Sequence, residues 1–542
     1  MIHGNLSGLK SSQVKALERI YRRRIPADQI ITPELARFLS ELSADVRRQL
    51  GVIIDRQGTV EYVIVGNDRE IVIPDLSDYG LGRSGLRGLR CIHTHLRGEP
   101  LSQDDLTDLA LLRLDLMAAV AVGERGLPGA VHYAHILPPN PEKKTAEILF
   151  APSIHELDLD LAAFLRSLDA ELERKMAETV DLSDRREKAI LVSVTHASLQ
   201  ETEDSLDELA ELARTADVLV LDRLIQRPRR INPKFLMGEG KIKEVIIRAL
   251  QQGATLLIFD QDLSPAQVRA ISAITEMKVI DRTQLILDIF ARRAHTLDGK
   301  VQVELAQLKY ILPRLSGKGT ALSRLMGGIG GRGPGETKLE IDRRRIRDRI
   351  THLEGQLKSM AKGRLQRRQR RIRAGVPIVS IVGYTNAGKS TLLNALTQSE
   401  VFTEDLLFAT LDTSTRRLRF PRDHEVIITD TVGFIRELPK SLLGAFSATL
   451  EELEDADLIL HVVDLSNPRF EEQISAVERI LTDLELDRIP RLMIFNKTDL
   501  VDAGEIAPLC RRFEAIPISA RQRRTFEPLL LELERRFWPG ED

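Results

Sequence analysis

The sequence is poor in cysteine. Among its 542 residues, only Cys91 and Cys510 carry a thiol. They lie far apart along the chain and neither belongs to a CxxC pair. This scarcity argues against a disulfide framework and favours a reducing compartment.

Neither a large net charge nor a long apolar run is present. The formal net charge is -2 although 29% of the residues are charged, so any attraction to a polyanion must come from a local cluster. The apolar run from Leu116 to Val122 is far too short to span a bilayer, and the polar N-terminus does not resemble a signal peptide. We expect a soluble cytoplasmic protein, and a monomer.

The length predicts roughly three or four domains. From about Lys188 to Tyr310, apolar strands alternate with helices, which is typical of a parallel α/β layer. A glycine-rich loop and strongly charged helices follow. The fold class is therefore multidomain α/β, with four predicted segments: residues 1–184, 185–310, 311–374 and 375–542.

The stretch GYTNAGKST, from Gly383 to Thr391, has the pattern of a phosphate-binding loop between an apolar strand and a helix. Its glycines let several backbone N–H groups point at one phosphate cluster, and the helix N-terminus adds a favourable dipole. Lys389 is expected to reach the β- and γ-phosphates, and Ser390 to ligate Mg²⁺.

Guanine specificity is indicated by IFNKTDL, which supplies Asn496, Lys497 and Asp499 directly after an apolar strand. The Asp499 carboxylate can accept hydrogen bonds from N1–H and the 2-amino group of guanine, which adenine cannot offer. The ISA stretch at Ile518 to Ala520 is expected to support the base through Ser519 and Ala520.

Between these motifs, DTVG places Asp430 at a strand end as a carboxylate for Mg²⁺. The N–H of Gly433 is predicted to sense the γ-phosphate. The four motifs occur in the order and spacing of a GTPase.

Together these motifs resemble the translation-factor class of GTPases and, more narrowly, the HflX family. The closest likeness lies in GYTNAGKSTLLNAL, LFATLDTSTRRL, DTVGFIRELP and NKTD, and in VQVELAQLKYILPRL followed by GGIGGRGPGETKLEIDRR. The resemblance implies an α/β HflX N-terminal domain, a charged helical arm and a P-loop GTPase domain with a mostly parallel sheet. An α/β or α+β extension, residues 1–184, precedes them.

The resemblance also implies GTP or GDP with Mg²⁺ as ligands. Ser390, Thr410 and Asp430 would hold the metal, and Lys389, Thr410 and Gly433 would take part in hydrolysis. The implied nucleotide contacts are Gly383, Tyr384, Thr385, Asn386, Ala387, Gly388, Lys389, Ser390, Thr391, Phe408, Thr410, Asp430, Gly433, Asn496, Lys497, Asp499, Ser519 and Ala520.

Three positions leave alternatives open. Thr413 stands where the family usually has proline, so Thr413 or Thr415 could replace Thr410 as the switch threonine. Phe434 occupies the position of the glutamine that orients the attacking water in Ras-like enzymes, which predicts slow hydrolysis accelerated from outside. Asn386 either helps to hold K⁺ or only stabilises the loop turn.

A basic run, KGRLQRRQRRIR from Lys362 to Arg373, adds to the arginines of residues 343–350 and to Arg332 and Lys338. Such a concentration favours contact with a phosphate backbone, although a charge run is often only a solvated helix. The family resemblance implies that the polymer is the rRNA of the 50S ribosomal subunit. It also implies a role in splitting or rescuing stalled ribosomes.

The first segment contains CIHTHLRGEPLSQDD, which brings His93 and His95 to a strand end and Asp105 to a helix start. Two imidazoles and a carboxylate can hold Zn²⁺ with one position open for water. The spacing resembles the JAMM metalloprotease motif, with a shorter gap to Ser102, and Glu61 would be the general base. The alternative is a degenerate, metal-free copy. A second function class is therefore a GTP-regulated enzyme with a zinc-dependent hydrolase site.

Overall fold

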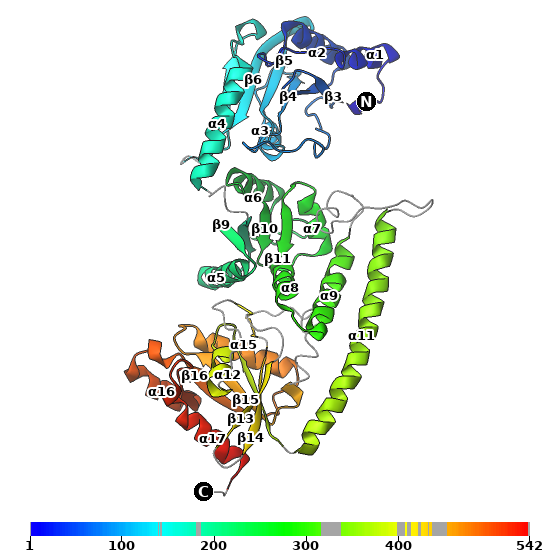
Figure 1. Cartoon of the computed structure of the whole chain (residues 1–542). Coiled ribbons are helices and arrows are strands. Elements are labelled where there is room, and N and C mark those ends of the chain that lie inside the picture. Colours follow the sequence, from blue (N-terminus) through cyan, green and yellow to red (C-terminus); the bar gives the residue numbers. More distant parts are fainter. Residues whose placement is uncertain are drawn as a thin grey trace. The chain divides into compact units, whose positions relative to one another are not determined.

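The computed structural model describes residues 2–138, 140, 144–179, 186–315, 338–374, 376–397, 407–408, 414–420, 424–431, 433–435 and 453–539. The chain divides into two compact units, residues 1–196 with 221–257 and 270–279, and residues 197–220 with 258–269 and 280–542. This division does not follow the four predicted segments, whose boundaries stay a prediction. The strands form three sheets (Figure 1).

The first sheet contains seven strands in the order β1-β3-β2-β4-β5-β6-β7. Pairs β1–β3 and β4–β5 are parallel, and the other pairs are antiparallel. The strands are β1 (His3–Gly4), β2 (Leu50–Asp55), β3 (Val60–Val65), β4 (Leu89–His95), β5 (Leu116–Val122), β6 (Pro128–Ile136) and β7 (Ala146–Ala151). The helices of this part are α1 (Ser11–Ile20), α2 (Pro33–Val46), α3 (Gln103–Leu111) and α4 (Leu161–Thr179), with short 3₁₀ turns η1 (Glu124–Gly126) and η2 (Ile154–Glu156).

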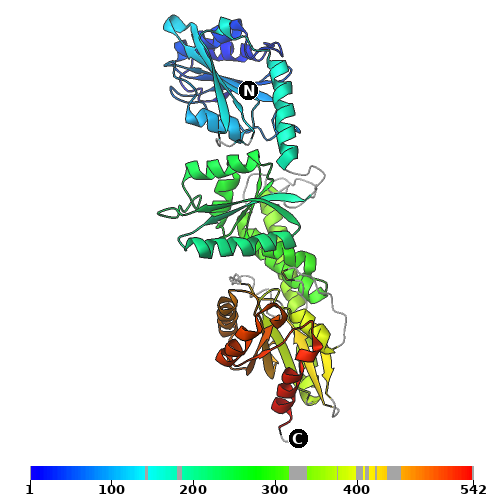
Figure 2. The same ribbon diagram turned by 90° about the vertical axis from the view of Figure 1, so that its left-hand side faces the viewer.

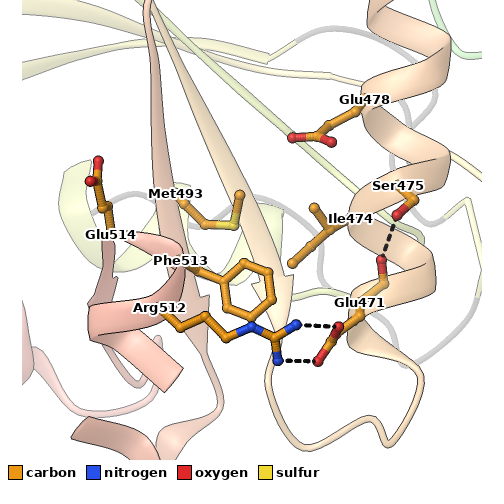
Figure 3. A pocket seen from close by; sticks show the side chains of 8 residues that line it. All are labelled: Glu471, Ile474, Ser475, Glu478, Met493, Arg512, Phe513 and Glu514. Carbon is orange, nitrogen blue, oxygen red and sulfur yellow. Dashed lines mark hydrogen bonds and ion pairs between the residues drawn. The ribbon is translucent and has the colours of Figure 1, made fainter. Parts of the chain in front are cut away.

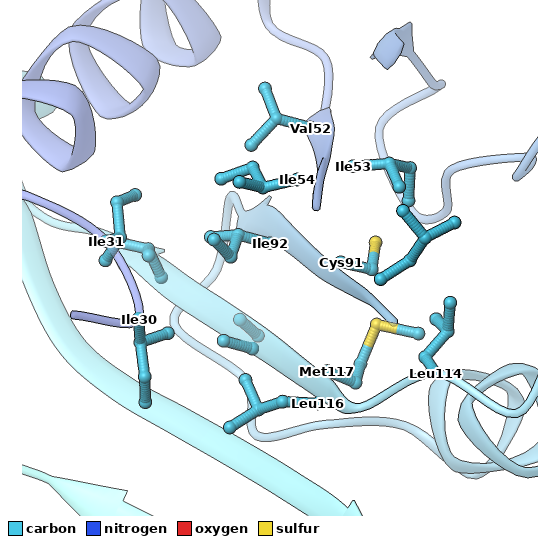
Figure 4. Close-up of a cluster of buried hydrophobic side chains, with 14 of the residues drawn as sticks. Ile30, Ile31, Val52, Ile53, Ile54, Cys91, Ile92, Leu114, Leu116 and Met117 are labelled. Atoms are coloured by element: carbon cyan, nitrogen blue, oxygen red, sulfur yellow. The ribbon is translucent and has the colours of Figure 1, made fainter. Parts of the chain in front are cut away.

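Aliphatic side chains fill the core of this first sheet (Figure 4). Every residue of β4 is buried, which explains why its polar side chains must find partners inside the protein. Cys91 lies within this core, and burial raises the pKa of its thiol well above the usual value. An apolar position of this kind suits cysteine as a small hydrophobic residue.

The apolar run of residues 71–73 favours a strand on sequence alone, but that prediction is wrong, because these residues form no strand. The free edge of β3 is taken instead by β1, because His3 and Gly4 pair with Ile64 and Val65. Ile71 packs on the core as a loop residue, so its apolar character reflects burial and not a strand.

The second sheet has the order β11-β10-β8-β9, and its strands alternate with helices along the chain as predicted. Figure 2 shows helices on both faces of this sheet. The elements are β8 (Glu187–Val194), α5 (Leu199–Thr215), β9 (Val218–Gln226), α6 (Glu239–Gln251), β10 (Leu256–Phe259), α7 (Pro265–Ser272), β11 (Lys278–Asp281) and α8 (Arg282–Arg293).

The described part of the predicted charged arm, residues 311–374, contains the long helix α11 (Lys338–Ala374). It packs through a small apolar cluster around Leu353 against α9 (Leu297–Ile311), which ends in a 3₁₀ turn η3 (Leu312–Arg314). Ion pairs Arg349–Glu304 and Lys309–Glu354, each 2.7 Å, flank that cluster. Within the described part of the chain, no helix combines the length and apolar composition required to cross a membrane.

The third sheet has the order β13-β14-β12-β15-β16-β17 and is parallel except for the β13–β14 pair. Its strands are β12 (Ile378–Gly383), β13 (Ser414–Arg419), β14 (Glu425–Asp430), β15 (Leu458–Asp464), β16 (Arg491–Asn496) and β17 (Ala515–Pro517). The helices are α12 (Lys389–Thr397), α15 (Phe470–Asp483), α16 (Ala503–Phe513) and α17 (Glu527–Phe537), with 3₁₀ turns η4 (Thr498–Leu500) and η5 (Arg523–Thr525). The carboxyl ends of its parallel strands meet at one edge, where such sheets bind ligands.

Candidate nucleotide-binding site

The predicted phosphate loop lies between β12 and α12, at the carboxyl end of a strand whose six residues are all buried. Two of its glycines are required by close contacts. A Cβ atom on Gly383 would lie 2.2 Å from the carbonyl oxygen of Val462, and one on Gly388 would lie 2.3 Å from Nδ2 of Asn496. The strand, loop and helix that the sequence predicts are therefore confirmed.

Lys389 is the first residue of α12 and is almost fully buried. Its Nζ donates a 2.8 Å hydrogen bond to the carbonyl oxygen of Tyr384, which folds the side chain back over the loop. Burial lowers the pKa of Lys389 to about 8, and the charge of Asp430 opposes that shift only in part. A buried cation at a helix N-terminus suits the charge of a bound phosphate group.

Ser390 and Asp430 form the second element of the site. The Ser390 hydroxyl donates a 2.6 Å hydrogen bond to Oδ2 of Asp430, at the end of the neighbouring strand β14. Hydroxyl and carboxylate oxygens are the ligands that Mg²⁺ prefers. The donor set therefore fits the predicted Mg²⁺, which would neutralise phosphate charge beside Lys389.

Gly433 and Phe434 close the other side of the loop. The N–H of Phe434 donates to the carbonyl oxygen of Gly383 at 3.1 Å, and its own carbonyl oxygen accepts from the N–H of Thr385 at 2.7 Å. A Cβ on Gly433 would lie 2.8 Å from the Thr385 side chain and 3.0 Å from Nζ of Lys389. Gly433 thus lies where a γ-phosphate sensor is expected.

Asn496, at the end of β16, connects two loops that are distant in sequence. Its Nδ2 donates to the carbonyl oxygen of Ala387 in the phosphate loop, and its Oδ1 accepts from the N–H of Ala520, both at 2.8 Å. The side chain is 1% exposed. Asn496 is therefore a positioning residue for both loops, a role that its motif alone does not reveal.

Lys497 and Asp499 follow β16 in a tight turn. Lys497 adopts a left-handed backbone conformation, and its Nζ lies 2.7 Å from Oδ2 of Asp464 at the end of β15. The Asp499 side chain is exposed. The protein alone does not bury this carboxylate, so a penalty against adenine arises only when the base itself covers it.

Ser519 and Ala520 follow β17 at this edge, and both of their N–H groups are bound within the protein. Ser519 is buried and its N–H is held by the Thr525 hydroxyl at 3.0 Å, whereas the N–H of Ala520 is occupied by Asn496. Asp464 was missed by sequence reasoning. The sequence pattern that could have revealed it is an acidic residue directly after the mostly apolar run LILHVV. This strand ends at the same edge of the sheet as Asn496.

Part of the predicted switch region lies outside the described residues, including Thr410 and Thr413. Phe408 is described, and it is 2% exposed with a positive φ of 54°. Thr415 lies within β13 opposite Thr429, so strand pairing alone accounts for its position.

Asn386 adopts a left-handed backbone conformation with φ of 61°. Asparagine tolerates this region better than most residues. The turn alone therefore gives a reason for asparagine here, and K⁺ binding at Asn386 stays a prediction.

A surface pocket of about 400 Å³ lies elsewhere on this domain, between α15, β16 and α16 (Figure 3). Met493, Ile474 and Phe513 form its floor. Arg512 and Glu471 close one side with paired hydrogen bonds of 2.9 and 3.1 Å. None of the predicted nucleotide contacts lines it.

The predicted histidine cluster of the first segment is assembled in the structure. Nε2 of His93 and Nε2 of His95 are 2.9 Å apart, and the Asp105 carboxylate lies 3.3 Å from His93 and 3.6 Å from His95. Burial and the neighbouring His93 ring lower the pKa of His95. The three side chains form a group that could hold a metal ion.

The prediction for Glu61 is wrong, since Glu61 does not join this cluster. His93 pairs with Gly51, which pairs with Ile64, so Glu61 lies two strands away and three residues further along. Strand geometry makes that separation roughly 14 Å. Glu61 instead accepts a 2.6 Å hydrogen bond from the hydroxyl of Tyr79.

The fold and the edge of the third sheet define a P-loop domain of the GTPase class. Family models match along the chain: GTP-binding GTPase N-terminal at residues 203–291, GTP-binding GTPase middle region at 293–371, and 50S ribosome-binding GTPase at 378–497. All three begin after the first segment, so they lend no support to its resemblance to JAMM metalloproteases.

Known relatives give the same assignment. GTPase HflX of Caldanaerobacter subterraneus subsp. tengcongensis is 49% identical over 358 residues, covering 66% of this chain and 82% of that protein. GTPase HflX of Escherichia coli (strain K12) is 47% identical over 325 residues, covering 60% and 76%. A GTP-binding protein from Sulfolobus solfataricus, solved with GDP, is 24% identical over 64% of this chain and 99% of its own, but its TM-score of 0.36 is too low to compare the structures. The chain belongs to the HflX family of GTPases, and it hydrolyses GTP.

Lys389 predicts a pH-dependent nucleotide affinity. With a pKa of about 8, Lys389 loses its proton as pH rises through 8 in the free protein, whereas bound phosphate charge would hold the proton on. The cation is about nine-tenths populated at pH 7 and about one quarter at pH 8.5, so GDP affinity should fall about fourfold over that range. Titration calorimetry in two buffers of different ionisation enthalpy should show proton uptake at pH 8.5. Uptake that is absent, or unchanged in Lys389→Arg, would remove Lys389 from the phosphate site.

Asp499 predicts the choice of base. Asp499→Asn exchanges one acceptor oxygen for an amide that can donate to the 2-carbonyl of xanthine, so GTP affinity should fall by on the order of 100-fold and xanthosine triphosphate should become preferred. Competition with a fluorescent nucleotide measures both. Asp487→Asn removes the same charge from an exposed position and should leave the preference for GTP intact. Retained GTP preference in the Asp499 variant would contradict the assignment.

Proposed function

We propose that this GTPase acts on the large ribosomal subunit, splitting or rescuing stalled ribosomes, and that the ribosome stimulates its GTP hydrolysis. The observation that carries the proposal is Phe434. It stands directly after Gly433, is 2% exposed, and has both its N–H and its carbonyl oxygen bound to the phosphate loop.

A phenyl ring can neither accept nor donate the hydrogen bonds that orient an attacking water. The two backbone bonds hold Phe434 against Gly383 and Thr385, so a small rotation cannot bring another group into its place. Phe434 cannot complete the site, and we infer that K⁺ held near Asn386 or a macromolecular partner supplies the missing group. Slow intrinsic hydrolysis and external stimulation follow from the same residue.

The charged arm indicates the partner. Helix α11 has 37 residues and therefore spans about 55 Å. From Gly355 to its end at Ala374 the sequence contains no acidic residue, and Lys362 to Arg373 contains seven basic ones. The preceding half of the helix contains acidic residues as well as basic ones, and Arg349 there pairs with Glu304 of α9.

A basic sequence without interspersed acidic residues suits a phosphate backbone read without sequence preference. The match of residues 378–497 to a 50S ribosome-binding GTPase model points to ribosomal RNA as the polyanion. Ribosomes as the target would also fit the predicted cytoplasmic location.

The alternative function, a zinc-dependent hydrolase in the first segment, has weaker support. His93, His95 and Asp105 do converge, but Glu61, the predicted general base, is bound to Tyr79 and distant from them. Hydrolytic chemistry there would need a base other than Glu61.

The arm predicts how binding depends on salt. Reversing the charge of Arg367, Arg368, Arg370 and Arg371 should weaken binding of the GTP-analogue-bound chain to purified 50S subunits. Each lost phosphate contact reduces the slope of log affinity against log salt by roughly 0.7 to 0.9, so four should reduce it by about 3. Subunit-stimulated GTP hydrolysis should be lost as well, while basal hydrolysis should persist.

A matched control reverses an equal charge on exposed basic residues of the first segment, at Lys15, Arg19, Arg22 and Arg24. This control should keep the wild-type salt slope and stimulation. An arm variant that behaves like the control would show that the basic run is only a solvated helix.

A further inference from the structure

The edge of the first sheet carries a second cluster with ligand character, formed by His93, His95 and Asp105. Alternation along β4 places both imidazoles on one face, while Thr94 between them points to the other face and bonds to Ser43 at 2.8 Å. The strand neighbours are small: Gly51 and Ala119 flank His93, and Ala121 pairs with His95. The sheet therefore leaves room for two rings to lean together.

The orientation of His95 is fixed from outside the cluster. Its Nδ1 lies 2.8 Å from the carbonyl oxygen of Glu99. Because a carbonyl oxygen can only accept, Nδ1 must carry the proton, and the lone pair of Nε2 is turned toward His93. Metal-binding histidines characteristically make this outer hydrogen bond.

Asp105 is oriented by the first turn of α3. Its Oδ2 accepts hydrogen bonds from both the N–H and the hydroxyl of Ser102, each 2.7 Å long, in a capping box. Oδ1 is left facing Nε2 of His93 at 3.3 Å. The carboxylate is thus held in place before any ligand arrives.

The atoms that converge here would be stabilised more by a cation than by contact with one another. When both histidines are neutral, the proton of His95 is on Nδ1, so only Nε2 of His93 can carry a proton toward the cluster. Two Nε2 atoms and a carboxylate therefore share at most one proton. The two Nε2 atoms are 2.9 Å apart, and Oδ1 of Asp105 lies 3.3 Å from Nε2 of His93. Both separations are close to the edge of about 3.3 Å expected for a tetrahedron with metal–ligand bonds of 2.0–2.1 Å. An ion would need to part the two rings by only a few tenths of an ångström.

From this geometry we propose that His93, His95 and Asp105 bind one Zn²⁺ ion. Two imidazole nitrogens and one carboxylate oxygen form a ligand set that zinc accepts and Mg²⁺ does not favour. The histidines are buried, but the Asp105 side chain is 16% exposed and Ser102 is exposed, so the fourth position opens toward solvent on that side. This proposal concerns binding and does not depend on the ribosomal function proposed above.

The test uses the full chain, saturated with GDP and Mg²⁺, stripped of other metals with a chelator and then titrated with Zn²⁺ against a chromophoric chelator. One Zn²⁺ per chain should bind and survive desalting, as measured by elemental analysis. Co²⁺ in its place should show the intense visible bands of a four-coordinate site. Millimolar Mg²⁺ should not displace either ion.

Variants assign the ligands. His95→Gln and Asp105→Asn should each lower Zn²⁺ affinity by roughly 100-fold or more, and Ser102→Ala, which removes only an outer hydrogen bond, by about tenfold. His155→Gln, at an exposed histidine of η2, should bind like the wild type. Circular dichroism checks that each variant is folded.

Two results would overturn the proposal. One is a wild-type chain that retains no Zn²⁺ after desalting and gives no Co²⁺ bands, which would leave a proton shared between the two imidazoles. The other is a set of folded variants that bind Zn²⁺ as tightly as the His155→Gln control. If His95→Gln does not fold, the exposed Ser102→Ala change and the wild-type stoichiometry still decide.

Discussion

The nucleotide site depends on one buried carboxamide. Asn496 binds the carbonyl oxygen of Ala387 and the N–H of Ala520, groups that lie 109 and 24 residues away in sequence. Removing it would leave both backbone groups buried without partners, at a cost of about 1–3 kcal/mol each. Through this side chain the position of the phosphate loop is coupled to that of the loop containing Ala520, which is predicted to contact the base. A nucleotide that orders one loop therefore orders the other.

Local patterns predicted the strand, loop and helix around the phosphate loop because that motif carries its own structural context. The phosphate loop needs only a strand, two glycines and a helix start, all readable within twenty residues. Contacts between distant segments could not be read in this way: neither the backbone bonds of Phe434 to Gly383 and Thr385 nor the bridging by Asn496 has a sequence signature. Glu61 failed for the same reason, because its distance from His93 depends on the register of β2 against β3.

His93, His95 and Asp105 were predicted together because β4 and the start of α3 are adjacent in sequence. The structure adds two hydrogen bonds that the sequence did not show. The carbonyl oxygen of Glu99 orients His95, and the hydroxyl of Ser102 orients Asp105. The first segment thus has a prearranged cluster of polar side chains, built on a sheet separate from that of the GTPase domain.

In the proposed function Phe434 links the structure to the activity, since it would make hydrolysis depend on a partner. The most direct measurement is the single-turnover rate of GTP hydrolysis by the full chain as purified 50S subunits are added. The rate should rise from a slow basal value to a plateau set by subunit binding. A rate that is already fast without subunits, or that does not change at saturation, would contradict this account.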